Sequence, residues 1–491
     1  MCCKVINFVC RKSKRLIGDS RDHKQHEIEQ IGDMINGISS LPDCILHHIL
    51  SFMPTKEVVK TSVLSTRWKN LWASVPNVDF DDALLYASEM DGRRPPKVTS
   101  FVKFVYRVLR LRDASNLEKF RLSCRVCFGA SIINTWISIA IMHNVRELDL
   151  CLLAEDPSVI PQSLFDATSL VSLKIEMNCV LILPSRISFP CLKTLHLSLV
   201  TFPNDESTEK LFLGCPVLQE LVLIDCDWFN LKNIMISSST LKKLTIDDLS
   251  YYGLLDEHSG CKIKIHTANL TYLEYIGYLS NEIILDNVVS LVDACIHIPK
   301  SYRKQKVSEC RATDLIKGLR YVASLRVSNR TIEEIDKLVY DVLIKPLVCA
   351  DTMVNHAPLF PNLIYLVLTV AIGDYTFEIL MDLLNVSPTL QSLCLSEGFE
   401  ICMRLGENNS TWVSKHICMA SHLKTLTFRN FRANDSEIWF LECVLKYAPV
   451  LEKLDIRWCK IQLLDVKMQR DVMKELESIE RFSTDCVIRL S

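Results

Sequence analysis

A short apolar phrase recurs along most of this 491-residue chain. It reads leucine, two variable residues, leucine, one variable residue and then leucine or isoleucine, as in CLKTLHL from Cys191 and TLKKLTI from Thr240. The first apolar residue of each copy falls at position 117, 145, 170, 192, 218, 241, 270, 291, 322, 363, 390, 423 or 451. Most copies lie 21 to 33 residues apart. This spacing predicts an array of stacked structural repeats.

Each phrase ends in an apolar-x-apolar alternation, which is typical of a strand that buries one face. Because a lone strand cannot bury that face, the copies should stack into a curved α/β (α+β) solenoid. The apolar spacing within 99–111 and 134–142 predicts helices that return the chain on the outer side. The irregular period of these copies, mostly in the twenties of residues, matches the leucine-rich repeat.

The residue between the last two apolar residues of a phrase should point to the concave face, away from the helices. These residues are Asp149, Lys174, His196, Val222, Thr245, Glu274, Arg326, Val367, Cys394, Thr427 and Asp455. The polar ones proposed for substrate contact are Lys174, His196, Thr245, Glu274 and Arg326. Their charges are mixed, so no single field identifies a ligand.

A second pattern precedes the repeats, in residues 39–72, which read SSLPDCILHHILSFMPTKEVVKTSVLSTRWKNLW. Prolines and apolar spacing predict three short helices, with Ser40, Thr55 and Ser65 as their N-caps. So short a stretch carries more apolar side chain than its own core can hide. We therefore expect part of the apolar stripe to pack against something else, as in a docking module.

This stretch resembles a plant F-box, from Leu41-Pro42-Asp43 at its start to Arg67-Trp68 and Leu71-Trp72 at its end. The resemblance implies that the module binds a Skp-type adaptor and, through it, a cullin ubiquitin ligase. It assigns the adaptor contacts to Leu41, Pro42, Ile45, Leu46, Ile49, Leu50, Val59, Leu64, Trp68, Leu71 and Trp72. The alternative is a small hydrophobic cap on the repeats that needs no partner.

The resemblance extends beyond the F-box. Residues 38–150 resemble the start of plant F-box/leucine-rich-repeat proteins, and 422–456 resemble the FBD module that often ends them. Within the second stretch, Asn430-Phe431-Arg432 and Glu437 match the module, while Ala433 stands where the family usually has glycine. The expected organisation is a disordered tail at 1–37, an F-box at 38–80, leucine-rich repeats at 81–415 and an FBD-like region at 416–491. Some plant relatives hold a hormone and an inositol phosphate in the arc. The concave residues lack the basic cluster that a polyphosphate needs, so no cofactor is expected.

Composition narrows the remaining function classes. A net charge of -2 provides no global attraction to nucleic acid, and no apolar run of 18 or more residues could span a membrane. Only 300–306, KSYRKQK, could form a basic patch, and it is expected to be an exposed loop. The 21 cysteines are scattered through apolar strings, which favours a reducing cytoplasmic or nuclear location. Near the N-terminus, Cys2 and Cys3 lie beside a run of basic residues, and such cysteines could be acylated.

Motifs of catalysis and metal binding are sparse. Cys124 and Cys127 form a CxxC without a second pair at zinc spacing, and both thiols are expected in the core. His47 and His48 are adjacent on a predicted helix and cannot share a face, so they should be partly solvated edge residues. We therefore expect no catalytic and no metal-binding residue. The sequence favours a non-catalytic adaptor that recruits a protein substrate for ubiquitination. A ligase-free interaction scaffold or inhibitor is the first alternative, and an enzyme with an unrecognised site is the second.

Overall fold

The computed structural model describes residues 38–83, 98–113, 116–249, 260–299, 306–328, 331–333, 335, 360–369, 371–385, 387–399, 422–460, 466–483 and 485–491. The chain divides into two compact units, Met1–Leu231 and Lys232–Ser491. The predicted N-terminal tail and nearly all of the basic segment at 300–306 lie outside the described residues.

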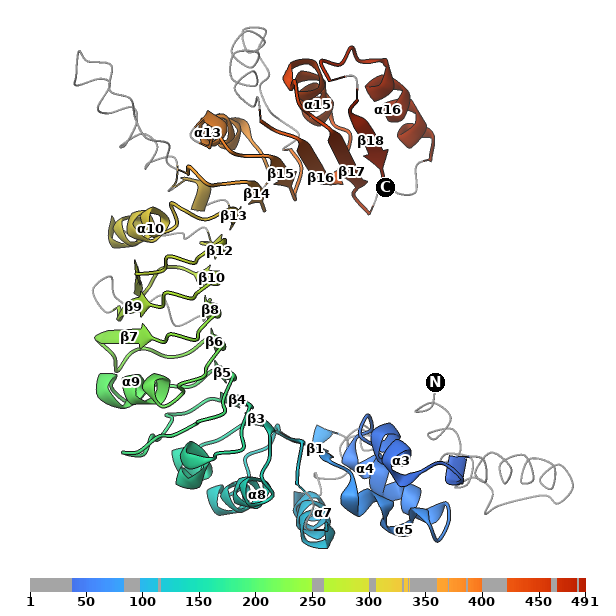
Figure 1. The fold of residues 1–491 in the computed structure, drawn as a ribbon, viewed down its shortest axis with the longest axis vertical. Helices are drawn as coiled ribbons and strands as arrows, with labels where there is room; N and C mark the ends of the chain where they lie inside the picture. Colours follow the sequence, from blue (N-terminus) through green and yellow to red (C-terminus); the bar gives the residue numbers. More distant parts are fainter. Residues whose placement is uncertain are drawn as a thin grey trace, which may run out of the picture. The chain divides into compact units, whose positions relative to one another are not determined.

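The first unit opens with three short α-helices, α3 (Asp43–Leu50), α4 (Thr55–Lys60) and α5 (Trp68–Leu71) (Figure 1). Two 3-10 turns, Thr61–Val63 and Trp72–Ser74, follow α4 and α5. The prediction that serine and threonine side chains cap these helices is wrong: the residues before them are Pro42, Pro54 and Arg67, without a side-chain cap. A proline there fixes the backbone entry to α3 and α4 and supplies no N–H that needs a partner.

Six parallel strands follow in the first unit. They are β1 (Asn77–Asp81), β2 (Lys119–Cys124), β3 (Glu147–Leu152), β4 (Ser172–Met177), β5 (Thr194–Ser198) and β6 (Glu220–Ile224), and neighbours in the chain are neighbours in the sheet. The helices α7 (Val98–Leu111), α8 (Ala130–Met142) and α9 (Asp205–Leu213) lie on one side of these strands (Figure 1). The two helices predicted in this region are confirmed, although α8 begins four residues earlier than expected and Leu111 is exposed.

The second unit continues the same plan with nine parallel strands. They are β8 (Lys243–Asp248), β10 (Tyr272–Gly277), β12 (Asp293–His297), β13 (Ser324–Val327), β14 (Tyr365–Leu368), β15 (Ser392–Leu395), β16 (Thr425–Phe431), β17 (Lys453–Trp458) and β18 (Val487–Leu490). Its longer helices are α10 (Lys306–Gly318), α13 (Asp374–Asn385), α15 (Asp435–Tyr447) and α16 (Val466–Ser478).

Part of the second unit departs from the predicted helical returns. Three return segments are strands, β7 (Asn233–Ser237), β9 (Lys262–His266) and β11 (Glu282–Asp286), which form a separate parallel sheet. In β7 and β9 buried isoleucines alternate with more exposed residues, as in KIKIH of β9. Such a period of two suits a strand and not a helix, and this explains why the expectation of helices is wrong here.

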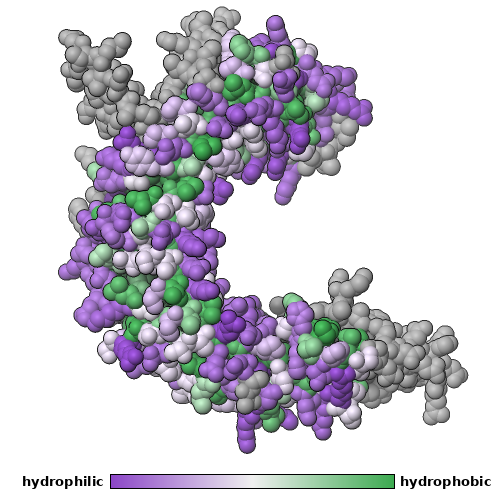
Figure 2. All heavy atoms as spheres, viewed as in Figure 1, coloured by the Kyte–Doolittle hydropathy of each residue, from purple (hydrophilic) through white to green (hydrophobic). Residues whose placement is uncertain are grey.

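Every one of the thirteen apolar phrases contains a strand, which begins two residues after the first apolar residue. Leu195 and Leu197 illustrate the alternation, since both are buried and His196 between them is half-buried. Two middle residues differ, because Val367 and Cys394 are themselves buried. The predicted mixed α/β architecture with an extended parallel sheet is confirmed, whereas the curvature of the whole array stays a prediction. Hydrophilic and hydrophobic residues alternate over the face of the molecule in Figure 2.

The turn between β16 and α15 contains a strained residue. Ala433 has a φ of +57°, the left-handed region that favours glycine. We predict that Ala433→Gly leaves stability unchanged or raises the free energy of unfolding by up to about 1 kcal/mol, because relief of the Cβ strain outweighs the added freedom of the unfolded chain. Chemical denaturation of both proteins measures this. Destabilisation by more than about 1 kcal/mol would contradict the argument.

Candidate functional site

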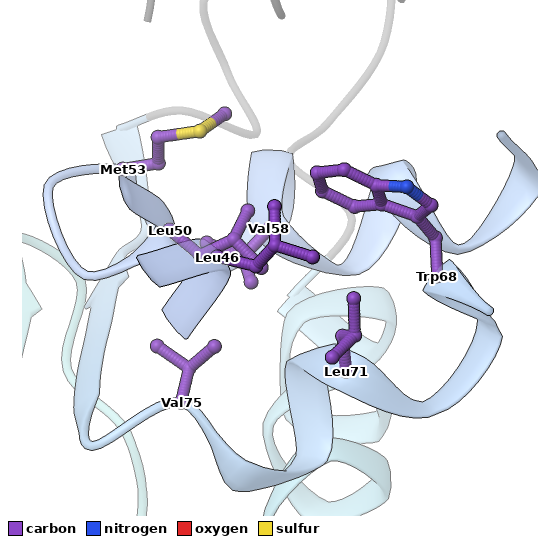
Figure 3. Close-up of a cluster of buried hydrophobic side chains, with 7 residues drawn as sticks. All are labelled: Leu46, Leu50, Met53, Val58, Trp68, Leu71 and Val75. Atoms are coloured by element: carbon purple, nitrogen blue, oxygen red, sulfur yellow. The ribbon is translucent and has the colours of Figure 1, made fainter. Parts of the chain in front are cut away.

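The N-terminal module has a core of its own, contributed by all three helices. Seven apolar side chains are buried together, and Figure 3 shows that they come from α3, α4, α5 and the segments that follow: Leu46, Leu50, Met53, Val58, Trp68, Leu71 and Val75. Trp68 is 1% exposed, and its indole Nε1 donates a hydrogen bond to Ser39 Oγ at 2.8 Å. This buried polar tip is therefore satisfied.

The start and the end of the module are tied together by Arg67. Its guanidinium Nη2 donates to the carbonyl oxygen of Leu41 and to Asp43 Oδ1, both at 2.5 Å. Because this ion pair is largely exposed, we expect it to contribute no more than about 1 kcal/mol to stability. Its more direct effect is geometric, since it fixes the first turn of α3 against the segment that leads into α5.

The eleven side chains predicted to bind an adaptor divide into two groups. Four lie in the core of the module: Leu46, Leu50, Trp68 and Leu71. The other seven are partly or fully exposed: Leu41, Pro42, Ile45, Ile49, Val59, Leu64 and Trp72. Only this second group can touch a partner without unfolding of the module.

The exposed apolar surface is larger than the prediction. Ile45 is 44% exposed, and two residues that the prediction left out, Phe52 and Val63, are 68% and 76% exposed. The apolar periodicity places Phe52 on the stripe of Ile45 and Ile49, just beyond the end of α3, although the resemblance does not assign it to the adaptor. Val63 lies in a 3-10 turn, where no helical period marks it. We call Leu41, Pro42, Ile45, Ile49, Phe52, Val59, Val63, Leu64 and Trp72 the apolar face of the module.

The module is joined to the first repeat through hydrogen bonds. The Asp79 N–H of β1 donates to Thr55 Oγ1 at 2.7 Å, and Arg112 Nη1 donates to the carbonyl oxygen of Val75 at 2.7 Å. The Asn77 amide also donates to the carbonyl oxygen of Ser51 at 3.3 Å. Ile45 and Phe52 remain exposed beside these contacts, so the apolar stripe of α3 is not buried against the repeats.

In the first unit, the strand residues that face away from the helices form a polar network around Arg121. Its guanidinium lies 2.9 Å from Asp79, 3.6 Å from Asp81 and 3.7 Å from Asp149, measured between nitrogen and carboxylate oxygen. Lys174 and His196 are direct neighbours across β4 and β5. Burial, and secondly the charge of Lys174, lowers the pKa of His196. The imidazole is therefore neutral near pH 7, with Nε2 3.0 Å from Ser198 Oγ.

The other three residues proposed for substrate contact lie in the second unit. Thr245 Oγ1 donates to Glu274 Oε2 at 3.3 Å, and the two residues are direct neighbours across β8 and β10. Arg326 is exposed on β13 and is a direct neighbour of Cys295 on β12. The other direct neighbour of Cys295 is Glu274 on β10. The structure thus brings Lys174 to His196, and Thr245 to Glu274.

The residues that the sequence offers for metal binding or catalysis are the CxxC cysteines and the adjacent histidines. Within the part of the chain that the structure describes, no group of three or more His, Cys, Asp or Glu residues could hold a metal ion. No helix among the same residues is long and apolar enough to cross a membrane. The expectation that both CxxC thiols are core is half wrong: Cys124 is buried in β2, whereas Cys127 is exposed because it follows the strand's end. His47 is half-buried and His48 exposed, as expected.

Comparison with known proteins decides the family. Family sequence models match three parts of the chain: the F-box domain at residues 38–79, the repeats described as "FBD-associated F-box protein At5g56370, LRR repeats" at 133–296, and FBD at 417–456. A putative F-box protein of Arabidopsis thaliana, At1g58310, is 30% identical over 92% of this chain and 95% of its own length. The chain belongs to the plant F-box/FBD/leucine-rich-repeat family.

Two further relatives from Arabidopsis thaliana carry all three labels between them. The FBD-associated F-box protein At1g66310 is 30% identical over 96% of this chain and 99% of its own length. The F-box/LRR-repeat protein At3g59200 is 34% identical over 85% of this chain and 81% of its own length. The resemblances to an F-box, to leucine-rich repeats and to an FBD module are thereby confirmed.

Proposed function

We propose that this F-box/FBD/leucine-rich-repeat protein is the substrate-recognition subunit of an SCF-type cullin ubiquitin ligase. In this proposal the apolar face of the module docks a Skp-type adaptor, which connects the chain to a cullin. The strand faces of the repeats bind a protein substrate. The chain itself is non-catalytic: it raises the local concentration of the substrate's lysines near the ubiquitin-charged conjugating enzyme.

The observation that carries the proposal is the division of the module into a closed core and an exposed apolar face. Leu41, Ile49, Leu64 and Trp72 of this face also pack against the core, whereas Ile45, Phe52 and Val63 are exposed beside it, and exposed apolar patches mark interaction sites. Hydrogen bonds from β1 and from Arg112 hold the module against the first repeat. Such a joint supports the proposal, since a bound substrate must be held at a defined distance from the ligase.

A location in the cytoplasm or nucleus is part of this proposal. The cysteines that the structure describes are free thiols, which suits a reducing compartment. Burial raises the pKa of the Cys215 thiol to about 12 and that of Cys443 to about 11. Thiols held protonated in this way are poor nucleophiles and behave as core residues.

The test is a pull-down of the purified chain with a plant Skp-type adaptor, comparing the wild type with Leu41→Ala/Pro42→Ala. We expect the variant to lose most of the adaptor, because both residues start α3 at the edge of the apolar face. Each truncated apolar contact in such an interface costs about 1–2 kcal/mol of binding. Equal recovery of the adaptor with both proteins would reject the proposed docking face.

The alternative is a scaffold or inhibitor that binds a partner through its repeats without ligase attachment. Burial of the stripe of α3 against the repeats would favour it, but Ile45 and Phe52 remain exposed. An adaptor that binds neither the wild type nor the variant would revive this alternative.

A further inference from the structure

The strand residues that face away from the helices carry a concentrated positive charge at one end of the second unit. The strands β13 to β17 bury the side that faces α10, α13 and α15, while the same side of the edge strand β18 is half-buried (Figure 1). Their other side carries the charged residues of these strands. On that other side stand five cations and one carboxylate: Arg326, Arg429, Lys453, Arg457 and Arg489, with Asp455. Hydrophilic residues gather along this side of the strands in Figure 2. We call this surface the basic face.

Among the residues that the structure describes, three of the five cations have no carboxylate within ion-pair distance. Asp455 serves the other two, since its Oδ2 lies 3.9 Å from Lys453 Nζ and 3.4 Å from Arg457 Nη2. For Arg326, Arg429 and Arg489, no Asp or Glu lies within ion-pair distance among the residues that the structure describes. All three are exposed. Exposed arginines on one rigid sheet are preorganised donors for carboxylate or phosphate groups.

The surroundings of these arginines are also suited to binding. Between Arg326 and Thr427 in the register lie Val367 and Cys394, which are both buried. Burial raises the pKa of Tyr365 on the same side of β14, while the charges of Arg429 and Arg326 both act on its phenol in the opposite sense. The phenol is therefore a neutral hydrogen-bond donor that experiences the charge of both guanidinium groups.

The middle residues of the repeat phrases, taken alone, give mixed charges without a basic cluster. Each strand presents two or three residues on the same side, so the middle residues are only part of this surface. Counting all of them brings Arg429, Lys453 and Arg457 into view, and β18 adds Arg489 from beyond the last repeat phrase. The corresponding side of β1 to β6 has the opposite excess, with six carboxylates and three cations: Asp79, Asp81, Glu147, Asp149, Glu176 and Glu220, against Lys119, Arg121 and Lys174.

We propose that the basic face binds an acidic polypeptide segment, and that the substrate recognised by this protein carries such a segment. The second clause rests on the function proposed above, whereas the first does not. Six parallel strands span about 24 Å from the first to the last, which an extended peptide of about seven residues would cross. A nucleic acid fits less well, because single-stranded bases need aromatic stacking platforms and Tyr365 is half-buried.

The test measures binding of labelled probes to the full chain, co-purified with its Skp-type adaptor. The probes are a glutamate/serine peptide, a glutamine/serine peptide of equal length and an oligothymidylate. We expect the acidic peptide to bind, more weakly as salt rises, and the glutamine peptide not to bind. The triple variant Arg326→Glu/Arg429→Glu/Arg489→Glu should weaken acidic-peptide binding at least about tenfold.

The matched control reverses three exposed cations on α16, Lys467→Glu/Arg470→Glu/Lys474→Glu, and should bind the acidic peptide like the wild type. Equal losses in both triple variants, or equal binding of the two peptides, would overturn the proposal. Tighter binding of oligothymidylate that depends on the same arginines would overturn it in favour of nucleic acid. If Arg326→Glu/Arg429→Glu/Arg489→Glu does not fold, the glutamine replacements at the same positions take its place. Adaptor retained without acidic-peptide binding would refute this inference alone. Acidic-peptide binding by a wild-type chain that binds no adaptor would refute the proposed function and the second clause, and would leave the basic face as a binding site.

Discussion

Ile45→Asp is expected to weaken adaptor binding by at least about a hundredfold while the chain keeps its fold. Ile45 is 44% exposed, so its side chain contributes little to the core of the module. In a complex, the same side chain would be buried against the adaptor. An aspartate at this position would have to lose its bound water without gaining a hydrogen-bond partner. Calorimetric titration with a Skp-type adaptor measures the affinity, and thermal unfolding measures the fold.

Two comparison variants separate binding from folding. Ile182→Asp makes the same change at a residue that is 41% exposed but lies among the repeats, so the adaptor affinity should not change. Trp68→Ala empties the core of the module and should destabilise it by about 3–5 kcal/mol, so adaptor and structure are lost together. Wild-type affinity in Ile45→Asp would show that α3 does not contact the adaptor.

Glu437→Gln is expected to lower the free energy of unfolding by about 1–3 kcal/mol, the typical cost of leaving a buried donor without its acceptor. Glu437 is fully buried on α15. Its Oε1 accepts from the Phe399 N–H at 3.1 Å, and its Oε2 accepts from the N–H groups of Arg432 at 2.8 Å and Asn434 at 3.3 Å. A glutamine supplies only one acceptor oxygen and turns its NH₂ group toward a backbone donor. Chemical denaturation measures the loss.

A matched control on the same helix is Glu442→Gln, which is half-buried outside this network and should change stability by less than about 1 kcal/mol. The close approach at Gly398 supports the tightness of the site, because a Cβ there would lie 2.5 Å from Glu437 Oε1. A loss below about 1 kcal/mol in Glu437→Gln would mean that the backbone N–H groups find other partners.

The same carboxyl group gives a pH dependence of defined sign. Burial, opposed by the backbone hydrogen bonds, raises the pKa of Glu437 above its ordinary value of 4.5. The folded state then binds the proton more tightly than the unfolded state, so this group's stabilising contribution is fully present below pH 4.5 and is lost as pH rises through the folded-state pKa. The stability difference between wild type and Glu437→Gln should therefore be larger near pH 4.5 than near pH 7. A difference independent of pH would contradict the raised pKa.

The repeats were predictable from sequence because one rule governs all of them. A strand buried on one face must alternate, so the position of the first apolar residue fixes where each strand begins, from Leu117 to Leu451. The outer returns were less predictable, because they only need to cover that buried face. Helix α8 and strand β9 both do so, and only the apolar period of each segment's own sequence distinguishes them.

The candidate site was predictable in composition but not in orientation. The apolar stripe of residues 41–72 identified the module, yet amphipathic spacing does not distinguish side chains that pack inward, such as Leu46 and Trp68, from those that face outward, such as Ile45. Which side is inward depends on how three helices meet, and that is a tertiary property. The helix starts were mispredicted for a local reason, since proline at 42 and 54 made side-chain caps unnecessary.

The central claim is tested most directly by size-exclusion chromatography of the wild-type chain mixed with a plant Skp-type adaptor and the adaptor-binding part of a cullin. The account predicts one complex that contains all three proteins, and it predicts that Ile45→Asp leaves the adaptor–cullin pair intact and elutes separately from it. Elution of the wild-type chain apart from a preformed adaptor–cullin pair would contradict the account, because the exposed apolar face would then serve another partner.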